Sequence, residues 1–291
     1  MAENSRLKIR VSKQWLELIE RLQDHPRRIV IMGDTDTGKS TLAVWLAAKL
    51  ADHETAALID ADVGQSRVGP PASIGWRLSH DTDVSFYFVG DVTPATRPSP
   101  VLSSLKRSID DAEEAGAGYT IIDTTGYISG FQARELKTAK VEIACPCDIL
   151  VLGDDPDVRR LRRGWHNFDD VTIHRLKTSG EVQHKTTEQR RAYRAREFKR
   201  WIGDVNLRWI SLEDKSLTAA TTDFEAPSDG GLLVAFTDRH RRGICIGLCR
   251  SIDVKQRRLA AYAPAEAEQA AGIVFGSVVL TKDGEEVNRL S

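Results

Sequence analysis

Residues 28–41 read RIVIMGDTDTGKST, and this stretch decides the fold. An apolar run, a loop bounded by Gly33 and Gly38, and a helix-forming run after Ser40 follow one another without a gap. The loop fits the pattern G-x-x-x-x-G-K-S/T, in which backbone N–H groups and a helix N-terminus surround a phosphate chain. The sequence therefore predicts a buried strand, a phosphate-binding loop and a helix, and with them a nucleoside triphosphate site.

The residues of this loop have expected roles. The two glycines allow the backbone angles that curl the loop around the phosphates. Lys39 is expected to reach the β- and γ-phosphates, and the Ser40 hydroxyl to bind Mg²⁺. The residues predicted to line the triphosphate site are Gly33, Asp34, Thr35, Asp36, Thr37, Gly38, Lys39, Ser40 and Thr41.

The composition is that of an ordinary globular protein. The 291 residues are 41% hydrophobic and 29% charged, with a net charge of −1, so nucleic-acid binding would have to come from local patches. No apolar run is long enough to span a membrane, and residues 1–6 lack the apolar core of a signal peptide. Four cysteines do not make a disulfide scaffold in a chain of this length. We therefore expect a cytoplasmic protein.

Acidic side chains end two of the predicted strands. The apolar run at residues 56–59 leads into Asp60 and Asp62, which share a face on an extended chain. The run at residues 119–122 ends in Asp123, a form that suits a carboxylate bound to a Mg²⁺-ligated water. Ligands of open α/β sheets bind at the carboxyl ends of the strands, which indicates that these acids belong to the nucleotide site.

Basic side chains gather between Lys185 and Arg200, where seven basic residues stand against two acidic ones. Arg190 and Arg194 are four residues apart and so share one face of a helix. A run of charges is often only a solvated face. Beside a triphosphate site in an otherwise neutral protein, a lid that faces the phosphates is the favoured interpretation.

Strand and helix patterns alternate up to about residue 204, and short strands follow. This order predicts an α/β fold of the P-loop NTPase class, with a largely parallel sheet, an arginine-rich helical lid and a small β-rich C-terminal domain. We expect a helical lead at residues 1–26, a nucleotide-binding domain at residues 27–204 that includes the lid at 185–204, and the β-rich domain at residues 205–291.

Taken together, these motifs resemble those of the polynucleotide 5′-hydroxyl kinases. That family includes the kinase subunit of the pre-mRNA cleavage machinery, the ribosomal-RNA-processing kinases and their archaeal and bacterial relatives. The similarity covers most of residues 27–204, and its motifs are the phosphate loop with Asp36 inside it, Asp60-Ala61-Asp62-Val63-Gly64-Gln65, Phe88-Val89-Gly90 with Thr93-Pro94, Thr124-Thr125-Gly126-Tyr127 and the lid. The phosphate loop occurs in many NTPases, whereas the Asp-x-Asp-x-Gly-Gln block combined with the lid is much more specific.

The resemblance implies transfer of the γ-phosphate of ATP to the 5′-hydroxyl of RNA or DNA, with Mg²⁺ as the metal. Lys39 would hold the phosphates, and Ser40 would hold the metal with Asp60 or Asp123 in its outer shell. Asp62 would orient or deprotonate the 5′-hydroxyl. The implied lid residues are Arg190 and Arg194, which would close over the phosphates.

On the acceptor side the resemblance implies contacts from Gln65, Arg67, Thr125 and Tyr127. The family often has Trp at the position of Tyr127, where an aromatic ring stacks on a base of the substrate, and Asn at the position of Asp123. A tyrosine ring can also stack on a base. A membrane is not an expected partner, and no protein partner is implied.

Two other classes remain open from the sequence. One is a P-loop GTPase switch, because Asp123-Thr124-Thr125-Gly126 fits the D-x-x-G pattern. However, Gly153-Asp154-Asp155 stands after Leu152, where a guanine-binding N-K-x-D motif would be expected. The other is an ATP-binding scaffold without activity, because fold alone does not determine function.

Overall fold

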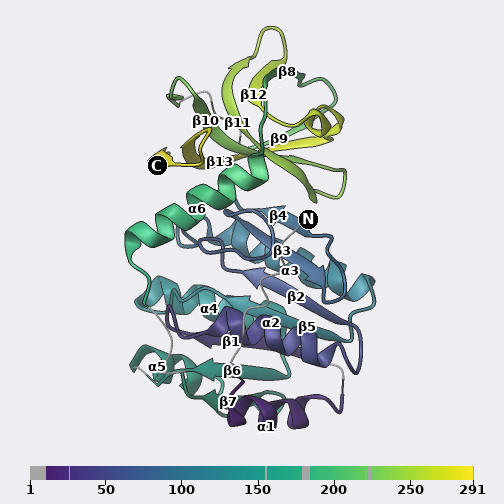
Figure 1. The fold of residues 1–291 in the computed structure, drawn as a ribbon, viewed down its shortest axis with the longest axis vertical. Helices are drawn as coiled ribbons and strands as arrows, with labels where there is room; N and C mark the ends of the chain where they lie inside the picture. The colour runs from purple at the N-terminus through teal and green to yellow at the C-terminus, as the bar shows by residue number, and fades with distance from the viewer. Residues whose placement is uncertain are drawn as a thin grey trace.

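The phosphate loop lies in a seven-stranded sheet with the order β4-β3-β2-β5-β1-β6-β7 (Figure 1). The computed structural model describes residues 11–25, 27–154, 156–178, 184–219, 221 and 224–290. The strands of this sheet are β1 (Arg28–Gly33), β2 (Ala56–Ala61), β3 (Ser73–Leu78), β4 (Ser85–Phe88), β5 (Tyr119–Thr124), β6 (Asp148–Leu152) and β7 (Thr172–Leu176). The five strands from β2 to β7 in this order are parallel, and β3 and β4 are antiparallel additions at one edge.

Alternate residues of β1 pack on opposite faces of the sheet, because successive side chains of a strand point in opposite directions. Val30 and Met32 belong to the core beneath α3 (Pro98–Glu114), α4 (Phe131–Ala144) and α5 (Pro156–Arg163). Ile29 and Ile31 belong to the core beneath α1 (Lys13–Leu22) and α2 (Lys39–Leu50). The sheet is therefore covered on both faces, as a mostly parallel sheet requires.

A second sheet forms the β-rich C-terminal part, with the order β14-β13-β10-β11-β12-β8 and with β9 paired to β13. Its strands are β8 (Leu207–Ser211), β9 (Ser216–Thr218), β10 (Gly230–Thr237), β11 (Gly243–Asp253), β12 (Arg258–Tyr262), β13 (Gly272–Thr281) and β14 (Glu286–Arg289), and a 3₁₀ helix spans Ala265–Gln269. All its strand pairs are antiparallel except that between β9 and β13.

Helix α6 (Thr187–Ile202) lies along the junction between the two sheets (Figure 1). Its Phe198 and Ile202 are buried in one cluster with Phe86 and Phe88 of β4 and with apolar residues of β10, β11 and β13. Because one hydrophobic cluster joins both sheets and α6, the C-terminal part holds the end of the lid helix in place.

The predicted fold class is confirmed, and the structure adds detail that the sequence did not indicate. Of the helical lead expected at residues 1–26, residues 1–10 and 26 lie outside the described residues, and α1 covers Lys13–Leu22. The strands β3, β7, β8, β9 and β14 were not predicted. Strand β9 has only three residues, and β7, β8 and β14 lie at sheet edges, where the hydrophobic pattern is weak, whereas β3 is an inner strand of six residues. The domain boundaries at residues 26 and 204 stay a prediction.

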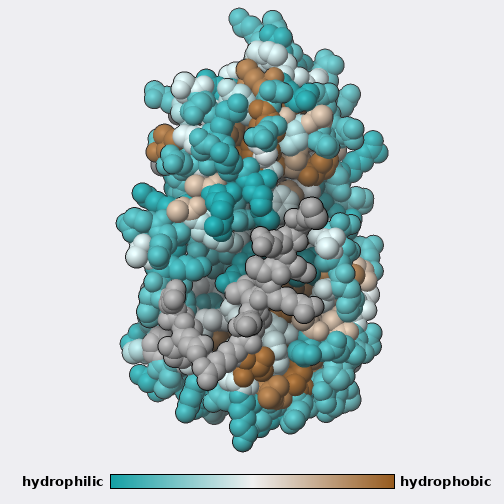
Figure 2. Space-filling view, in the orientation of Figure 1, coloured by the Kyte–Doolittle hydropathy of each residue, from teal (hydrophilic) through white to brown (hydrophobic). Residues whose placement is uncertain are grey.

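The surface seen in Figure 2 is mostly hydrophilic, with hydrophobic patches on the C-terminal part and at the opposite end of the molecule. Among the described residues, no helix is long and apolar enough to cross a membrane.

Candidate active site

The phosphate loop joins β1 to α2. Gly38 adopts the left-handed conformation with φ of 91° immediately before α2, and Asp36 also has a positive φ of 55°. Lys39 is 6% exposed, and its ammonium group donates a 2.5 Å hydrogen bond to the carbonyl oxygen of Asp34. Burial lowers the pKa of Lys39, and the nearby carboxylates of Asp123 and Asp62 oppose this shift. The lysine is thus directed into the loop, where a phosphate chain would give it a partner.

The remaining residues of the predicted triphosphate site lie in the same loop and in the first turn of α2. The Thr37 hydroxyl donates to the Asp34 carbonyl oxygen at 2.8 Å, which fixes the curl of the loop. The side chain of Asp34 accepts from the N–H of Thr35 at 2.6 Å. Ser40 and Thr41 are half-buried residues of α2.

Asp60 organises the loop that follows β2. It is 3% exposed, and its carboxylate accepts hydrogen bonds from the N–H groups of Asp62 at 3.0 Å, Arg67 at 2.5 Å and Val68 at 3.1 Å. Burial raises the pKa of Asp60, as do the carboxylates of Asp123 and Asp62. Both of its oxygens are thus committed to the protein, which favours a structural role for Asp60 over a role at the metal.

Asp123 is better suited to a metal ion. It lies opposite Asp60 in the β2–β5 register and opposite Ile31 in the β1–β5 register, and it is 3% exposed. Among the described residues its buried Oδ1 atom has no hydrogen-bond partner. Burial raises its pKa, while the Ser40 hydroxyl and the charge of Lys39 lower it. A buried free oxygen beside the loop serine fits Mg²⁺, which is usually bound by one or two side chains together with phosphate oxygens and waters.

Asp62 lies in the loop after β2, where its Oδ1 atom accepts from the N–H groups of Gly64 and Gln65, each at 3.1 Å. Its charge acts on Lys39 and on Asp123, so it lies within electrostatic range of the phosphate loop. The side chain of Arg67, at the far end of this loop, is exposed. The loop thus presents the oriented carboxylate of Asp62 and the exposed cation of Arg67 near the phosphate loop.

The segment after β5 contacts the phosphate loop closely. A side chain at Gly126 would lie within 2.5 Å of backbone atoms of Thr35, so glycine is required at this approach. The hydroxyl of Thr125 accepts from the N–H of Tyr127 at 3.2 Å. Tyr127 is half-buried and packs partly against the core under α3 and α4. The structure therefore holds Thr125 and the half-buried Tyr127 beside the phosphate loop.

The lid helix α6 contacts both the phosphate loop and the loop after β2. The Arg190 guanidinium forms an ion pair with the Asp36 carboxylate at 2.7 Å, and the Asp36 carboxylate also accepts from the N–H of Lys185 at 2.9 Å. The side-chain amide of Gln65 donates to the Arg190 carbonyl oxygen at 3.4 Å. Thr186 caps the helix, in a reciprocal arrangement with Gln189. Arg190 is therefore held directly over the phosphate loop.

Arg194 has a different environment. Its guanidinium lies 2.5 Å from the Glu286 carboxylate of β14, which also pairs with Arg289 at 2.8 Å. Arg289 in turn donates to the hydroxyl of Thr93 at 2.7 Å. Although Arg190 and Arg194 share a helix face, this structure directs Arg190 to the phosphate loop and Arg194 to the C-terminal sheet. The predicted catalytic role of Arg194 stays a prediction.

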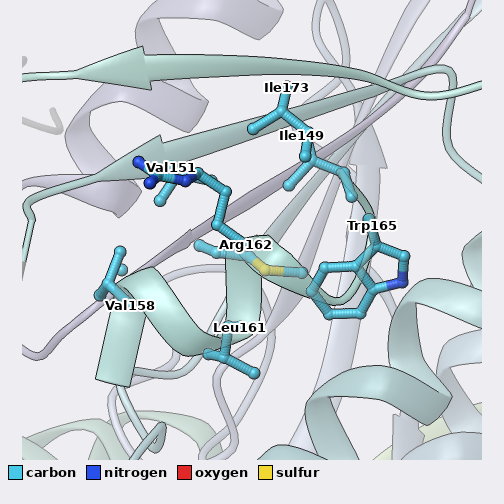
Figure 3. A pocket seen from close by; sticks show the side chains of 9 residues that line it. Ile149, Val151, Val158, Leu161, Arg162, Trp165 and Ile173 are labelled. Atoms are coloured by element: carbon cyan, nitrogen blue, oxygen red, sulfur yellow. The ribbon is translucent and has the colours of Figure 1, made fainter. Parts of the chain in front are cut away.

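A narrow apolar pocket adjoins the phosphate loop between α5 and the sheet (Figure 3). The residues that line it are Met32, Gly33, Ile149, Val151, Val158, Leu161, Arg162, Trp165 and Ile173. In Figure 3, Val158, Leu161 and Arg162 on α5 face the strand residues Ile149 and Val151. Most of these side chains belong to the hydrophobic core. We therefore assign the pocket to the packing of α5 and not to substrate binding.

Three residues near the site were not singled out from the sequence. The Tyr193 hydroxyl on α6 donates to the Ser66 carbonyl oxygen at 2.7 Å, which attaches the lid to the loop after β2. Lys137 and Lys140 on α4 are buried beneath the carboxyl ends of β2 and β5. The signal for the lysines was present: both fall on the otherwise apolar stripe of α4 that contains Leu136 and Val141.

Comparison with known proteins shows which family the chain resembles. Residues 33–203 match the family described as "mRNA cleavage and polyadenylation factor CLP1 P-loop". A polyribonucleotide 5′-hydroxyl-kinase of Pyrococcus furiosus is 33% identical over 208 residues, which cover 67% of this chain and 56% of that protein. A polyribonucleotide 5′-hydroxyl-kinase of Pyrococcus abyssi is 26% identical over 94% of this chain and 93% of its own length.

The chain spans little more than half the length of two of these relatives. It covers 56% of the Pyrococcus furiosus protein and 58% of a polyribonucleotide 5′-hydroxyl-kinase of Pyrococcus horikoshii. Among solved structures, that of a Clp1p–Pcf11p complex matches with a TM-score of 0.67 over 90% of this chain and 76% of that chain, at 12% sequence identity. At this identity the structural likeness shows the fold alone.

Proposed function

The chain belongs to the CLP1 P-loop family, and on that premise we propose that it is an ATP-dependent polynucleotide 5′-hydroxyl kinase acting on RNA or DNA. One observation carries this proposal: a single hydrogen-bonded network joins the phosphate loop, the acceptor-side loop and the lid. Asp36 holds Arg190 over the triphosphate site, and Gln65, three residues after Asp62, contacts the same turn of the lid. These contacts support a site in which the phosphate loop, the proposed acceptor carboxylate Asp62 and the lid arginine would act together.

In the proposed reaction, the 5′-hydroxyl oxygen of the acceptor forms a bond to the γ-phosphorus of ATP while the bond to the β–γ bridging oxygen breaks and ADP leaves. Asp62 accepts the hydroxyl proton. Loop amides and Lys39 hold the phosphates, and Arg190 stabilises the charge that spreads over the equatorial oxygens. Ser40 and Asp123 would hold Mg²⁺, which would neutralise part of the negative charge of the phosphates.

The decisive test is incubation with γ-labelled ATP or GTP and an oligonucleotide that carries a 5′-hydroxyl. We expect label on the 5′ end from ATP, and none after removal of Mg²⁺ by a chelator. The matched control is the same oligonucleotide with a 5′-phosphate, which offers no acceptor. GTP hydrolysis without transfer would instead support a GTPase switch, and ATP binding without turnover would support a scaffold. RNA and DNA versions of the oligonucleotide separate the two acceptor classes.

Replacement of the proposed base gives a first prediction. Asp62→Asn should leave ATP binding unchanged and lower kcat by ~10²–10⁴-fold, the usual contribution of a positioned general base. The amide oxygen of Asn can still accept the hydrogen bonds from Gly64 and Gln65, so the loop should keep its shape. Nucleotide affinity and single-turnover transfer measure the two effects. Unchanged turnover would exclude Asp62 as the acceptor-side carboxylate.

Replacement of the proposed stacking residue gives a second prediction. Tyr127→Ala should raise the KM for the oligonucleotide, since a base stacked on an aromatic ring contributes ~1–3 kcal/mol. ATP affinity should barely change. Tyr127→Trp is the informative partner variant, because the larger ring should lower the same KM. If Tyr127→Ala destabilises the protein but leaves the oligonucleotide KM at the wild-type value, Tyr127 is a packing residue only.

A further inference from the structure

Two lysines on α4 occupy positions where lysine is rarely found. Lys137 and Lys140 are each 1% exposed and stand among the largest fully buried side chains of the described residues. They share the stripe of α4 that packs on the sheet. Burial of an ammonium group is costly unless hydrogen bonds and opposite charges compensate. A hydrophobic residue at either position would avoid this desolvation cost, so the contacts of the two ammonium groups indicate why lysine is present.

Each lysine reaches the end of a strand that carries a site residue. The Lys140 Nζ atom donates to the carbonyl oxygen of Ala61 at 3.0 Å, in the peptide unit that immediately precedes Asp62. The Lys137 Nζ atom donates to the carbonyl oxygen of Thr125 at 2.6 Å and to the Thr124 hydroxyl at 3.0 Å. Both anchored carbonyl groups lie at or just beyond the last residue of a strand, where the backbone leaves the sheet.

The surrounding charge explains how two lysines can be buried here. Burial lowers the pKa of Lys140 to about 8, and the carboxylates of Asp62, Asp60 and Asp123 oppose that shift. Burial also lowers the pKa of Lys137, and the neighbouring charge of Lys140 lowers it further. Asp62 and Asp123 thus supply opposite charge to both lysines, and Asp60 supplies it to Lys140 as well.

We propose that Lys137 and Lys140 are positioning residues of this site, with Lys140 fixing the loop that holds Asp62 and Lys137 fixing the segment that holds Thr125 and Tyr127. The proposal rests on the proposed function, and it assigns the two lysines to different steps. Lys140 acts through the carboxylate that activates the acceptor. Lys137 acts through the residues that bind the acceptor strand.

These separate roles predict that substitution of Lys140 changes mainly kcat and that substitution of Lys137 changes mainly the oligonucleotide KM. Methionine has nearly the shape of lysine without its charge, so Lys140→Met should lower kcat by ~10-fold or more, since small misplacements of a reacting group are costly. Its oligonucleotide KM should stay near the wild-type value. Lys137→Met should instead raise the oligonucleotide KM by a similar factor with little change in kcat. Lys49→Met, at an exposed lysine near the end of α2, is the matched control.

A merely structural role for the lysines would give a different result. Both variants would then be less stable, yet their folded fractions would show wild-type kcat and KM, and this outcome would overturn the proposal. Equal changes in kcat and KM for the two variants would overturn it as well, because the two anchors would then have no separate tasks.

A measurement on the unmodified protein covers the case in which the variants do not fold. If the lysines anchor these segments, the amide hydrogens of residues 62–65 and 125–127 should exchange as slowly as those of β2 and β5, which precede them. Fast exchange there would contradict the anchoring. This readout needs no kinase activity, so a wild-type protein that phosphorylates no 5′-hydroxyl end would refute the proposed function without deciding the role of the lysines.

Discussion

Lys39→Ala should lower phosphoryl transfer by at least ~10³-fold and leave the protein folded, since loss of a single preorganised donor already costs ~10²–10³. Lys39 is the first residue of α2, and its ammonium group bonds to the loop itself, where the phosphates are expected to bind. Alanine is a strong helix former, and the substitution removes a charge whose burial is unfavourable. Helix α2 should therefore stay folded in this variant although phosphoryl transfer is lost.

Transfer from labelled ATP and thermal unfolding measure these two effects. Lys49→Ala, on the same helix but exposed, is the matched control and should retain full transfer. If Lys39→Ala phosphorylates oligonucleotides at the wild-type rate, the nucleotide site proposed here is wrong. If the variant is unfolded, the loss of transfer is uninformative, and Lys39→Met, which keeps most of the side-chain volume, replaces it.

Arg190→Lys should lower kcat by ~10³-fold, the effect typical of an arginine that stabilises the transferring phosphoryl group. A guanidinium presents a planar fork of donors that a lysine cannot reproduce. In the structure this fork already lies over the phosphate loop, bound to Asp36. A negatively charged triphosphate would offer it a stronger partner at nearly the same place, so the arginine can transfer from the carboxylate to the phosphates with little motion.

Arg191→Lys is the control for this experiment, because Arg191 is the neighbouring residue and its side chain is exposed. Steady-state kinetics should show a large loss for Arg190→Lys and almost none for Arg191→Lys. Equal, small effects would mean that α6 is only a solvated basic helix. ATP affinity should change less than kcat, because the arginine stabilises the transition state more than the ground state.

Arg194→Lys tests whether the second lid arginine contacts the phosphates during the reaction or only holds α6 to the C-terminal sheet. A loss of kcat comparable to that of Arg190→Lys would support the catalytic role inferred from the sequence, and would require Arg194 to leave Glu286 during the reaction. A loss of stability with normal kcat would identify the Arg194–Glu286 pair as a brace between the lid helix and β14. Glu286→Gln, which removes the same pair from the other side, should then reproduce the effect on stability.

Residue spacing in the sequence identified candidate site residues, but only their contacts in the structure distinguish their roles. The roles of Asp60 and Asp123 looked interchangeable in the sequence, since both are acids at strand ends. The structure separates them, because backbone N–H groups occupy the Asp60 carboxylate, while one buried oxygen of Asp123, near Ser40, has no hydrogen-bond partner in the part of the chain that the structure describes. Likewise, the helical spacing of Arg190 and Arg194 gave no reason to choose between them.

The sequence by itself determined the phosphate loop, the acids at the ends of β2 and β5, the lid helix and the α/β class. Each of these follows from residues close together in the chain, where backbone geometry and hydrophobic periodicity act directly. The tertiary structure alone decided that Arg190 meets Asp36, that Arg194 meets Glu286 and that two lysines of α4 support the strand ends. These partners are separated by 12 to 154 residues in the chain, so no local rule could pair them; the packing of α4 and α6 against the two sheets does so.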